Sequence, residues 1–334
     1  MAKYDPKVTP WQINEQGFPG KGSSAEKLKF LLRYAILAPS SYNTQPWRFA
    51  IGENEIRLFA DMSRWMRVTD PDKRELFISA GCALENLLIA AEHFGYGHQV
   101  AYFPEPDKEE LVATIKFILR RQPSPFRDPA LFGTITLRHT NHNIYEERPI
   151  ADTDLKRLQN CCVEESILLY MIKDLETKRK VNELIIRADM IQYSDPSYRK
   201  ELGYWIGKGV FGESWLVSKL GQLIMTYINS GKKQAREDSE MLMSAPVLVL
   251  LGSKVNDKVS LVRVGQVFER ICLMATALGV RVQPMSQIVE VQSLKSELKK
   301  LIPSFDAFPQ HFFRMGYAEP EKEHTPRRPL EEVL

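Results

Sequence analysis

The sequence contains no apolar run long enough to cross a membrane. Its longest runs, residues 245–252 and 87–91, fall far short of the ~20 residues that a spanning helix needs. Residues 1–6 have no apolar stretch behind Lys3, so they do not have the form of a signal peptide. We therefore expect a cytoplasmic protein without a membrane partner.

Cysteine is scarce, and neither sign of charge dominates. The 334 residues include 4 cysteines, none in a Cys-x-x-Cys pair, which favours buried reduced thiols over disulfides or a zinc site. Lys and Arg number 45 against 42 Asp and Glu, a formal net charge of +3. So small a surplus argues against nucleic acid as a partner. Hydrophobic residues make up 44% of the chain, enough for the core of about two domains.

Several familiar enzyme motifs are also missing. No Gly-x-Gly-x-x-Gly follows a predicted strand, and there is neither a phosphate-binding loop ending in Gly-Lys-Ser/Thr nor a Gly-x-Ser-x-Gly elbow. The sequence therefore indicates neither a Rossmann nucleotide site nor a serine hydrolase. His139 and His142 form a His-x-x-His pair without a third ligand nearby in the sequence, so we expect no metal site.

The first part of the chain predicts a helix, a hairpin and a long buried helix. Ser23 and Glu26 have the spacing of a capping box, ahead of a helix that runs to about residue 38. Strand-like runs follow at 47–51 and 56–60, and the apolar stretch 76–94 predicts a central helix. Residues 112–119 and 132–137 predict further strands.

The second part of the chain repeats this plan. Four residues of the long helix recur at a constant offset of 184: Gly81, Glu85, Ala91 and Gly95 match Gly265, Glu269, Ala275 and Gly279. Residues 154–162, which lead to the strand-like run 167–172, mirror the first helix and strand. We infer two halves, residues 1–125 and 126–334, with a helical insertion in the second half at about 174–244.

Two polar segments stand out from their apolar surroundings. From the residues alone, ordinary turns are the favoured explanation of segments 39–45 and 138–143. However, residues 38–49 read Ala-Pro-Ser-Ser-Tyr-Asn-Thr-Gln-Pro-Trp-Arg-Phe, which resembles a segment of the FMN-dependent nitroreductase family. The Arg-His-Thr of residues 138–140 is similar to that family's Arg-x-Ser/Thr, and residues 313–317 and 327–333 resemble its closing segment.

The repeated plan narrows this resemblance to a subgroup. Together with Glu201-Leu-x-x-Trp205 in the insertion, it is most similar to the Acg-like proteins, in which two copies share one chain. The resemblance implies an α+β, nitroreductase-like fold whose two pseudo-symmetric halves form an internal dimer around a flavin. The reciprocal site lacks both its arginine, in segment 18–23, and its Pro-Ser-x-x-Asn loop, in segment 161–166. One FMN per chain is therefore expected.

The resemblance also implies the cofactor-binding residues. Arg138, Thr140 and Arg327 would hold the FMN phosphate, because guanidinium groups bind phosphate in a bidentate fork. Residues from both halves would line the ring and ribityl chain: Pro39, Ser40, Ser41 and Asn43 from the first, and Pro284, Met285 and Ser286 from the second. His142 stands where the family commonly has Arg or Lys. We expect Gln45 to stabilise the turn and Trp47 to pack in the core.

The function implied is that of an FMN-dependent oxidoreductase of nitroreductase type. NADH or NADPH would serve as a transient reductant, and a small molecule such as a nitroaromatic or quinone would accept the electrons. The flavin carries this chemistry, so no side chain is assigned as catalytic. The alternatives are a non-catalytic flavin-binding or flavin-storing protein, its site covered by the insertion, and a structural protein whose site has decayed. The sequence leaves open whether the internal pseudo-dimer forms a further homo-oligomer.

An aromatic cluster in the insertion has two interpretations. Its members are Tyr204, Trp205, Phe211 and Trp215. These side chains either pack the insertion onto the body or cover the flavin.

Overall fold

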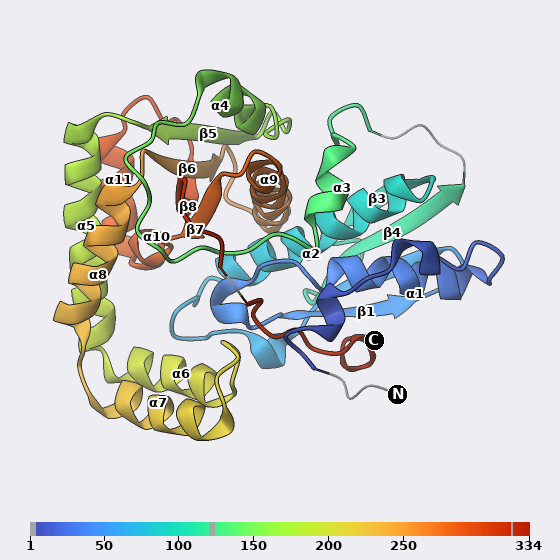
Figure 1. Cartoon of the computed structure of the whole chain (residues 1–334), viewed down its shortest axis with the longest axis horizontal. Helices are drawn as coiled ribbons and strands as arrows, with labels where there is room; N and C mark the ends of the chain where they lie inside the picture. The colour runs from blue at the N-terminus through green and yellow to red at the C-terminus, as the bar shows by residue number, and fades with distance from the viewer. Residues whose placement is uncertain (1–4, 120–123, 322) are drawn as a thin grey trace.

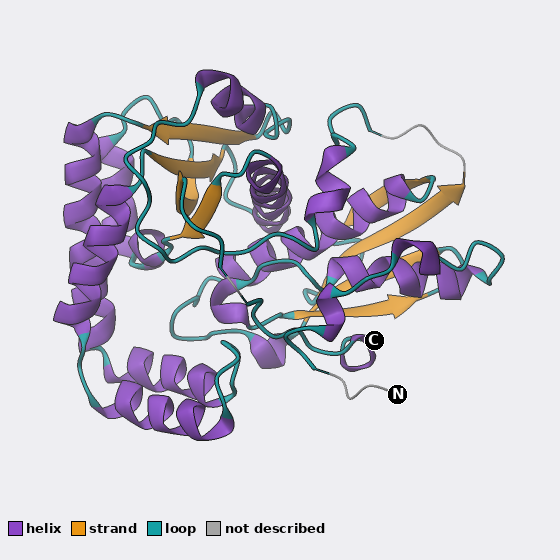
Figure 2. Cartoon of the chain, in the orientation of Figure 1, coloured by secondary structure: helices purple, strands orange, loops and turns teal. Residues whose placement is uncertain are grey.

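The chain forms two four-stranded sheets with helices packed against and between them (Figures 1 and 2). This computed structural model describes residues 5–119, 124–321 and 323–334. The α+β class expected from the sequence is confirmed by the separation of the two antiparallel sheets from the helices that cover them.

The first sheet contains the hairpin that the sequence predicts. Its strands are β1 (Trp47–Ile51), β2 (Glu55–Ala60), β3 (Tyr96–Tyr102) and β4 (Leu111–Leu119). All neighbours are antiparallel, in the order β1-β2-β4-β3. Helix α1 (Ser24–Ala35) begins with the complete capping box of Ser23 and Glu26.

The second sheet repeats the topology of the first. Its strands are β5 (Ile167–Ile172), β6 (Val247–Ser253), β7 (Arg281–Pro284) and β8 (Phe308–Gly316). Their order, β5-β6-β8-β7, corresponds strand by strand to that of the first sheet. A register shift also falls at equivalent places, between β2 and β4 and between β6 and β8. The sequence repeat is thus a repeat of structure, while the boundary at residue 125 stays a prediction.

Two long helices cross where the halves meet. Helices α2 (Arg74–His93) and α9 (Lys258–Ala277) approach at Gly81 and Gly265. A Cβ on Gly81 would lie 2.1 Å from the carbonyl oxygen of Val262, and one on Gly265 would lie 2.0 Å from that of Ile78. Each pair of equivalent residues is 184 positions apart. Only glycine permits this approach, and a pseudo-twofold axis passes between the two helices there.

The two halves share one hydrophobic core. A single cluster of buried residues draws from α1, α2, β1 and β4 of the first half and from α9, β6 and β8 of the second. Among the described residues, α2 is the one helix whose length and composition would suffice to cross a membrane, and 89% of its most apolar window is buried inside the protein. This helix is therefore the centre of the fold.

The segment at 174–244 is helical, as the sequence predicts. It consists of α5 (Leu175–Ser194), α6 (Pro196–Gly207), α7 (Trp215–Tyr227) and α8 (Gly231–Ser244). Helices α5 and α8 pack together beside the second sheet, and the α6–α7 pair extends from their far end toward the loops of the first half (Figure 1). The remaining helices are α3 (Ala130–Thr134), α4 (Asp152–Gln159), α10 (Gln287–Glu290) and α11 (Gln292–Leu301).

The strand expected at 132–137 is wrong, because helix α3 occupies this region. The Asp128 carboxylate accepts a hydrogen bond from the Ala130 N–H (2.9 Å) and starts a helical turn. Leu131 and Ile135 then bury their side chains four positions apart, which is helical spacing. The β-branched residues in this run favoured a strand, and the turn at Asp128 together with burial at helical spacing outweighed that preference.

All four cysteines are free thiols, as expected from the sequence. Cys82, Cys161 and Cys272 are buried, and Cys162 is half-buried. Burial raises the pKa of each thiol. None of the four therefore has the thiolate character of a nucleophile.

Candidate functional site

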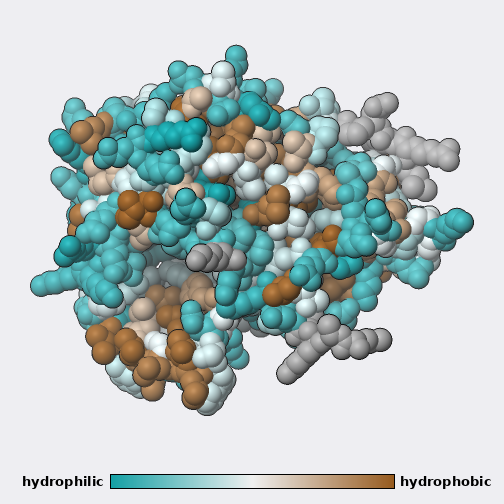
Figure 3. All heavy atoms as spheres, viewed as in Figure 1, coloured by the Kyte–Doolittle hydropathy of each residue, from teal (hydrophilic) through white to brown (hydrophobic). Residues whose placement is uncertain are grey.

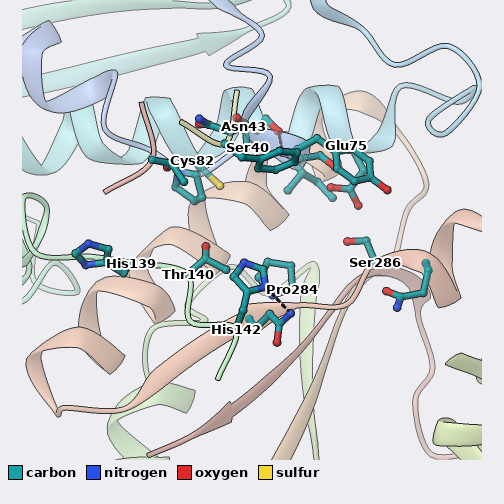
Figure 4. A pocket seen from close by; sticks show the side chains of 18 of the residues that line it. Ser40, Asn43, Glu75, Cys82, His139, Thr140, His142, Pro284 and Ser286 are labelled. Carbon is teal, nitrogen blue, oxygen red and sulfur yellow. Dashed lines mark hydrogen bonds between the residues drawn. The ribbon is translucent and has the colours of Figure 1, made fainter. Parts of the chain in front are cut away.

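A cavity of about 680 Å³ lies between the two halves and brings the two polar segments together. Figure 4 shows Ser40 and Asn43 on one side of it and Thr140, His142, Pro284 and Ser286 on the other. The residues that the resemblance assigns to flavin binding and that line this cavity are Pro39, Ser40, Ser41, Asn43, Arg138, Thr140, His142, Pro284, Ser286 and Arg327. The volume is within the usual range for small-molecule sites.

Met285 is the one assigned residue that does not line the cavity. Its side chain is 2% exposed and packs in a second hydrophobic cluster with residues of α10, α11 and β8. Its backbone N–H donates to the carbonyl oxygen of Phe312 (2.9 Å). Side chains alternate between the two faces of an extended chain, so Pro284 and Ser286 face the cavity while Met285 faces the core.

The loop at 39–45 has a strained backbone. Tyr42, Asn43 and Gln45 have positive φ angles of 47°, 52° and 50°, a region that residues with a Cβ rarely adopt. The Ser40 hydroxyl accepts from the Gln45 N–H (2.9 Å) and helps to hold this conformation. Because strain of this kind persists only where surrounding contacts enforce it, it often marks a functional site.

The turn and the chain end stabilise each other. The Gln45 side-chain oxygen accepts from the Arg328 N–H (2.8 Å), and its amide donates to the carbonyl oxygen of Pro326 (3.3 Å). Trp47 is fully buried in the shared core. The sequence-based expectations for Gln45 and Trp47 are both confirmed.

Arg327 connects the C-terminal segment to the loop. Its Nη1 donates to Asn43 Oδ1 (2.9 Å), and its Nη2 donates to the carbonyl oxygens of Leu37 (3.1 Å) and Ala38 (3.2 Å). Burial, and then repulsion from Arg138, lower the pKa of Arg327, while Glu269 opposes the shift. Two buried guanidinium groups thus act on each other at one end of the cavity.

Arg138 is only weakly compensated. It is 4% exposed, and its Nε lies 3.9 Å from Glu269 Oε1. Within the described part of the chain, Arg138 Nε has no hydrogen-bond partner. Burial raises the pKa of Glu269 to about 7, although Arg138 acts against the shift. Near neutral pH, Glu269 is therefore partly protonated and neutralises Arg138 incompletely.

His142 adds no fixed charge to the cavity wall. Burial lowers its pKa below the usual value, and its Nδ1 lies 2.9 Å from the side-chain nitrogen of Gln283. The imidazole is therefore neutral near pH 7. Thr140 is positioned next to it by a parallel bridge to Val282, at the edge of the second sheet.

Acidic and phenolic residues from the insertion and its surroundings also line the cavity, and sequence reasoning missed them. They are Asp189, Tyr193, Tyr198 and Asp238 from the insertion, and Glu75 and Glu290 from the body. Burial raises the pKa of both Asp189 and Glu290 to about 8. One sequence signal was present, because Asp189 continues the apolar face of Leu184, Ile185 and Ala188 on α5. The side chains that meet it could not be identified without the fold.

A stack of rings closes another part of the wall. Trp11 stacks on His324 (3.8 Å between ring centroids), and His139 stacks on the opposite face of His324 (3.7 Å). The Arg327 guanidinium lies 4.6 Å from the Trp11 ring centroid. His139, the middle residue of the segment 138–140, therefore packs against other rings in the cavity wall.

The pseudo-symmetric position is filled by ion pairs. Glu85, the equivalent of Glu269, accepts from Arg127 Nε (2.7 Å) and lies 3.1 Å from Arg270 Nη1. Arg270 also donates to Glu164 (2.6 Å) and stands where the first half has Asn86. Burial alone would raise the pKa of Glu85, but the two arginines hold it at about 2. These cations are neutralised within the protein, in contrast to Arg138.

The cavity residues fit a phosphate-bearing planar cofactor. Arg138 offers a buried guanidinium whose Nε has no hydrogen-bond partner in residues 5–119, 124–321 and 323–334. Its neighbour Arg327 has a lowered pKa that an anion would restore. The rest of the wall carries hydroxyl, amide and carbonyl groups together with apolar carbon, as ligand sites for flat heteroaromatic molecules do.

Known proteins resemble the chain over almost its whole length. "Putative NAD(P)H nitroreductase Rv3131" of Mycobacterium tuberculosis is 27% identical over 322 residues, covering 93% of this chain and 91% of the relative. "Putative NAD(P)H nitroreductase acg" of the same organism is 27% identical over 330 residues, covering 93% and 96%. The resemblance to nitroreductases, and to the Acg-like subgroup, is thus confirmed. No family model matches the chain.

Solved structures give a more distant likeness. A nitroreductase with bound FMN from Desulfitobacterium hafniense has a TM-score of 0.42 and 13% identity, covering 61% of this chain and 96% of that one. The FMN-dependent nitroreductase NfnB of Mycobacterium smegmatis, in complex with NADPH, has a TM-score of 0.41 and 12% identity, with the same coverage.

Proposed function

We propose that this chain is an FMN-dependent oxidoreductase of nitroreductase type, which passes electrons from NADH or NADPH to a small organic acceptor such as a nitroaromatic or a quinone. The observation that supports this most directly is the incompletely neutralised Arg138 beside Arg327, at one end of a cavity that joins both halves of the motif. The names of the full-length relatives support the same function.

The residues divide into two groups by what they would hold. Arg138, Thr140 and Arg327 would bind the FMN phosphate, since buried cations and a hydroxyl suit a dianion. The 39–43 loop from one half, and Pro284 and Ser286 from the other, would enclose the ring and ribityl chain. Bound there, FMN supplies a centre that accepts and donates a hydride. The chain's own task is to orient the reactants and exclude water, so no side chain is required as acid or base.

The test is reduction of the bound flavin. FMN-loaded protein is mixed anaerobically with NADH or NADPH, and the flavin absorbance is followed before and after a nitroaromatic or quinone is added. The proposal predicts bleaching by at least one nicotinamide and recovery on addition of an acceptor. If FMN binds but neither nicotinamide bleaches it, the chain is not this enzyme.

A second candidate function is a protein that holds flavin without turnover. The observation that favours it is how firmly the insertion is fastened over the loop. Asn43 Nδ2 donates to the carbonyl oxygen of Val210 (2.6 Å), and the Tyr42 and Tyr198 hydroxyls are 2.9 Å apart. In this case FMN remains oxidised with both nicotinamides and dissociates slowly. The cytoplasmic location and any further homo-oligomer stay predictions.

A further inference from the structure

Helix α7 turns its apolar residues outward, the reverse of an ordinary surface helix. Leu216, Leu220, Leu223 and Tyr227 share one face and are 72%, 59%, 56% and 78% exposed. Trp215 in the first turn is 70% exposed. Figure 3 shows apolar side chains gathered where Figure 1 places α7. A contiguous apolar patch of this kind marks an interaction surface.

The inner face of α7 is mostly small and polar instead, with Met225 as its apolar exception. It meets α6 at Gly203 and Gly207, which are separated by three residues. A Cβ on Gly207 would lie 2.0 Å from Gln222 Oε1, and one on Gly203 would lie 2.5 Å from Thr226 Oγ1. Close packing through small residues, with apolar side chains outside, is how helices pair in lipid. Helix α7 therefore has the polarity of a lipid-facing helix, whereas α6 carries Arg199, Lys200 and Glu201.

The charges around this face suit anionic headgroups. Helix α7 carries one charged residue, Lys219, and no acidic one, although the exposed Glu213 precedes it. Lys232 and Lys233 follow at the start of α8, where Lys233 pairs with Glu237 (3.7 Å). Long lysine side chains at the border of an apolar face reach toward headgroups. Trp215 and Tyr227 stand at the two ends, and these residue types are enriched at the boundary between membrane and water. This combination favours a lipid surface over a protein partner.

The length of α7 decides its orientation. Its 13 residues extend ~20 Å, too short to span a bilayer, so a lipid-bound α7 lies in the plane of the surface. The earlier expectation of no membrane partner rested on the lack of a spanning run, which does not bear on such a helix.

We propose that α7 docks the protein on a membrane surface that contains anionic lipid. Its outer apolar residues enter the headgroup region: 215, 216, 217, 220, 223, 224, 227 and 228. Phe211 and Glu213, in the connection that leads into α7, line the cavity, so a short segment joins the docking face to the candidate site. The docking itself does not depend on the proposed redox function.

The test is co-sedimentation of the full chain with vesicles of phosphatidylcholine, alone or mixed with phosphatidylglycerol. We expect binding to the mixed vesicles that weakens as salt is added, because the lysine contribution is screened. The variant L220Q/L223Q should bind roughly tenfold or more weakly, since two leucines no longer enter the lipid. The matched control L175Q/V255Q replaces residues that are 51% and 53% exposed outside α7, and should bind like the wild type.

A second measurement uses the wild-type protein and so does not depend on a substitution that could destabilise the fold. Brominated lipid should quench fluorescence from Trp215 in the wild type, and W215F should remove that quenching. The proposal is overturned if the wild type does not bind the mixed vesicles, or if L220Q/L223Q binds them equally well. It is also overturned if the wild type forms a concentration-dependent dimer, lost in L220Q/L223Q, and binds no vesicles, because a second copy then covers the face.

Discussion

At the scale of single residues, cofactor binding should depend strongly on Arg138. We expect Arg138→Ala to weaken FMN binding by ~1.5–3 kcal/mol, the range for a hydrogen bond to a charged group, and Thr140→Ala to cost less. Quenching of flavin fluorescence on titration gives the dissociation constant. The matched control is Arg236→Ala, whose side chain is 82% exposed and pairs with Glu240. Equal losses in both variants would show that Arg138 does not bind the phosphate.

Asp189 should make stability depend on pH. Burial, and then repulsion from Asp238, raise the pKa of Asp189 to about 8 in the folded protein, against 3.8 for the ordinary group. The folded state therefore keeps a proton that the unfolded state has lost, and this contribution to stability falls as pH rises from about 4 through 8. Asp189→Asn removes the titration, so its urea midpoint should fall less than that of the wild type between pH 5 and 8.

The size of that effect should be on the order of 1 kcal/mol or more. Asp107→Asn is the control, since Asp107 is exposed and its replacement should leave the pH dependence unchanged. Parallel pH profiles for Asp189→Asn and the wild type would mean that the carboxyl is already ionised in the folded protein.

How far the sequence predicts individual residues depends on the kind of signal. The loop at 39–45 and the segment 138–140 can be recognised in the sequence because each is a run of consecutive residues of characteristic types. Met285 was assigned because residues 284–286 resemble the family's segment beside the flavin, and such a resemblance does not say which way each side chain of an extended segment points. Asp189 and Asp238 meet only because α5 and α8 pack together, and their partners cannot be identified from either helix alone.

At the scale of elements, helices α2 and α9 cross so closely that there is no room for a side chain at Gly81 or Gly265. We expect Gly81→Ala to destabilise the protein by at least ~2 kcal/mol, because the new Cβ would lie 2.1 Å from a backbone carbonyl that cannot rotate away. Urea unfolding measures the change. Gly133→Ala is the matched control at an exposed position of α3, where a Cβ meets nothing within 4 Å, and it should be neutral or stabilising by up to ~1 kcal/mol.

One carboxylate contributes three of the hydrogen bonds that hold the α6–α7 hairpin to the first half. Glu201 accepts from the Val68 N–H (3.0 Å), the Thr69 N–H (2.8 Å) and the Thr69 hydroxyl (2.8 Å). If the hairpin covers the site, Glu201→Ala should speed FMN release several-fold, because opening no longer breaks these bonds. The rate is measured by stopped flow, with an excess of another flavin-binding protein, free of flavin, that traps the FMN as it is released. Glu183→Ala, at an exposed position of α5, is the control, and equal rates would argue against a lid.

Elements with complete local signals are the ones that the sequence predicts well. Ser23 and Glu26 cap α1, and unbroken apolar periodicity marks α2 and α9. The run at 132–137 has β-branched residues that favour a strand, and the turn at Asp128 that starts α3 was not recognised in the sequence. From the sequence repeat, only the order of helices and strands in the two halves could be inferred. Which strands pair within each sheet could not.

At the scale of the whole molecule, the two halves differ in how their central glutamates are neutralised. Glu85 has Arg127 and Arg270 within ion-pair distance, whereas Glu269 has Arg138 at 3.9 Å. We therefore expect one FMN per chain, since a phosphate at the Glu85 position would have to displace existing ion pairs. Flavin released by denaturation, divided by protein concentration, tests this. A ratio near two would mean that those pairs open.

The covalent joining of the halves removes dilution as a route to inactivation. In an assembly of two separate chains, a shared site disappears when the subunits dissociate, so occupancy depends on protein concentration. Here α2 and α9 cross within one polypeptide, and the second half is always present at a high effective concentration. The cavity between them therefore persists at any protein concentration at which the chain stays folded. Only the binding of ligands to it then depends on concentration.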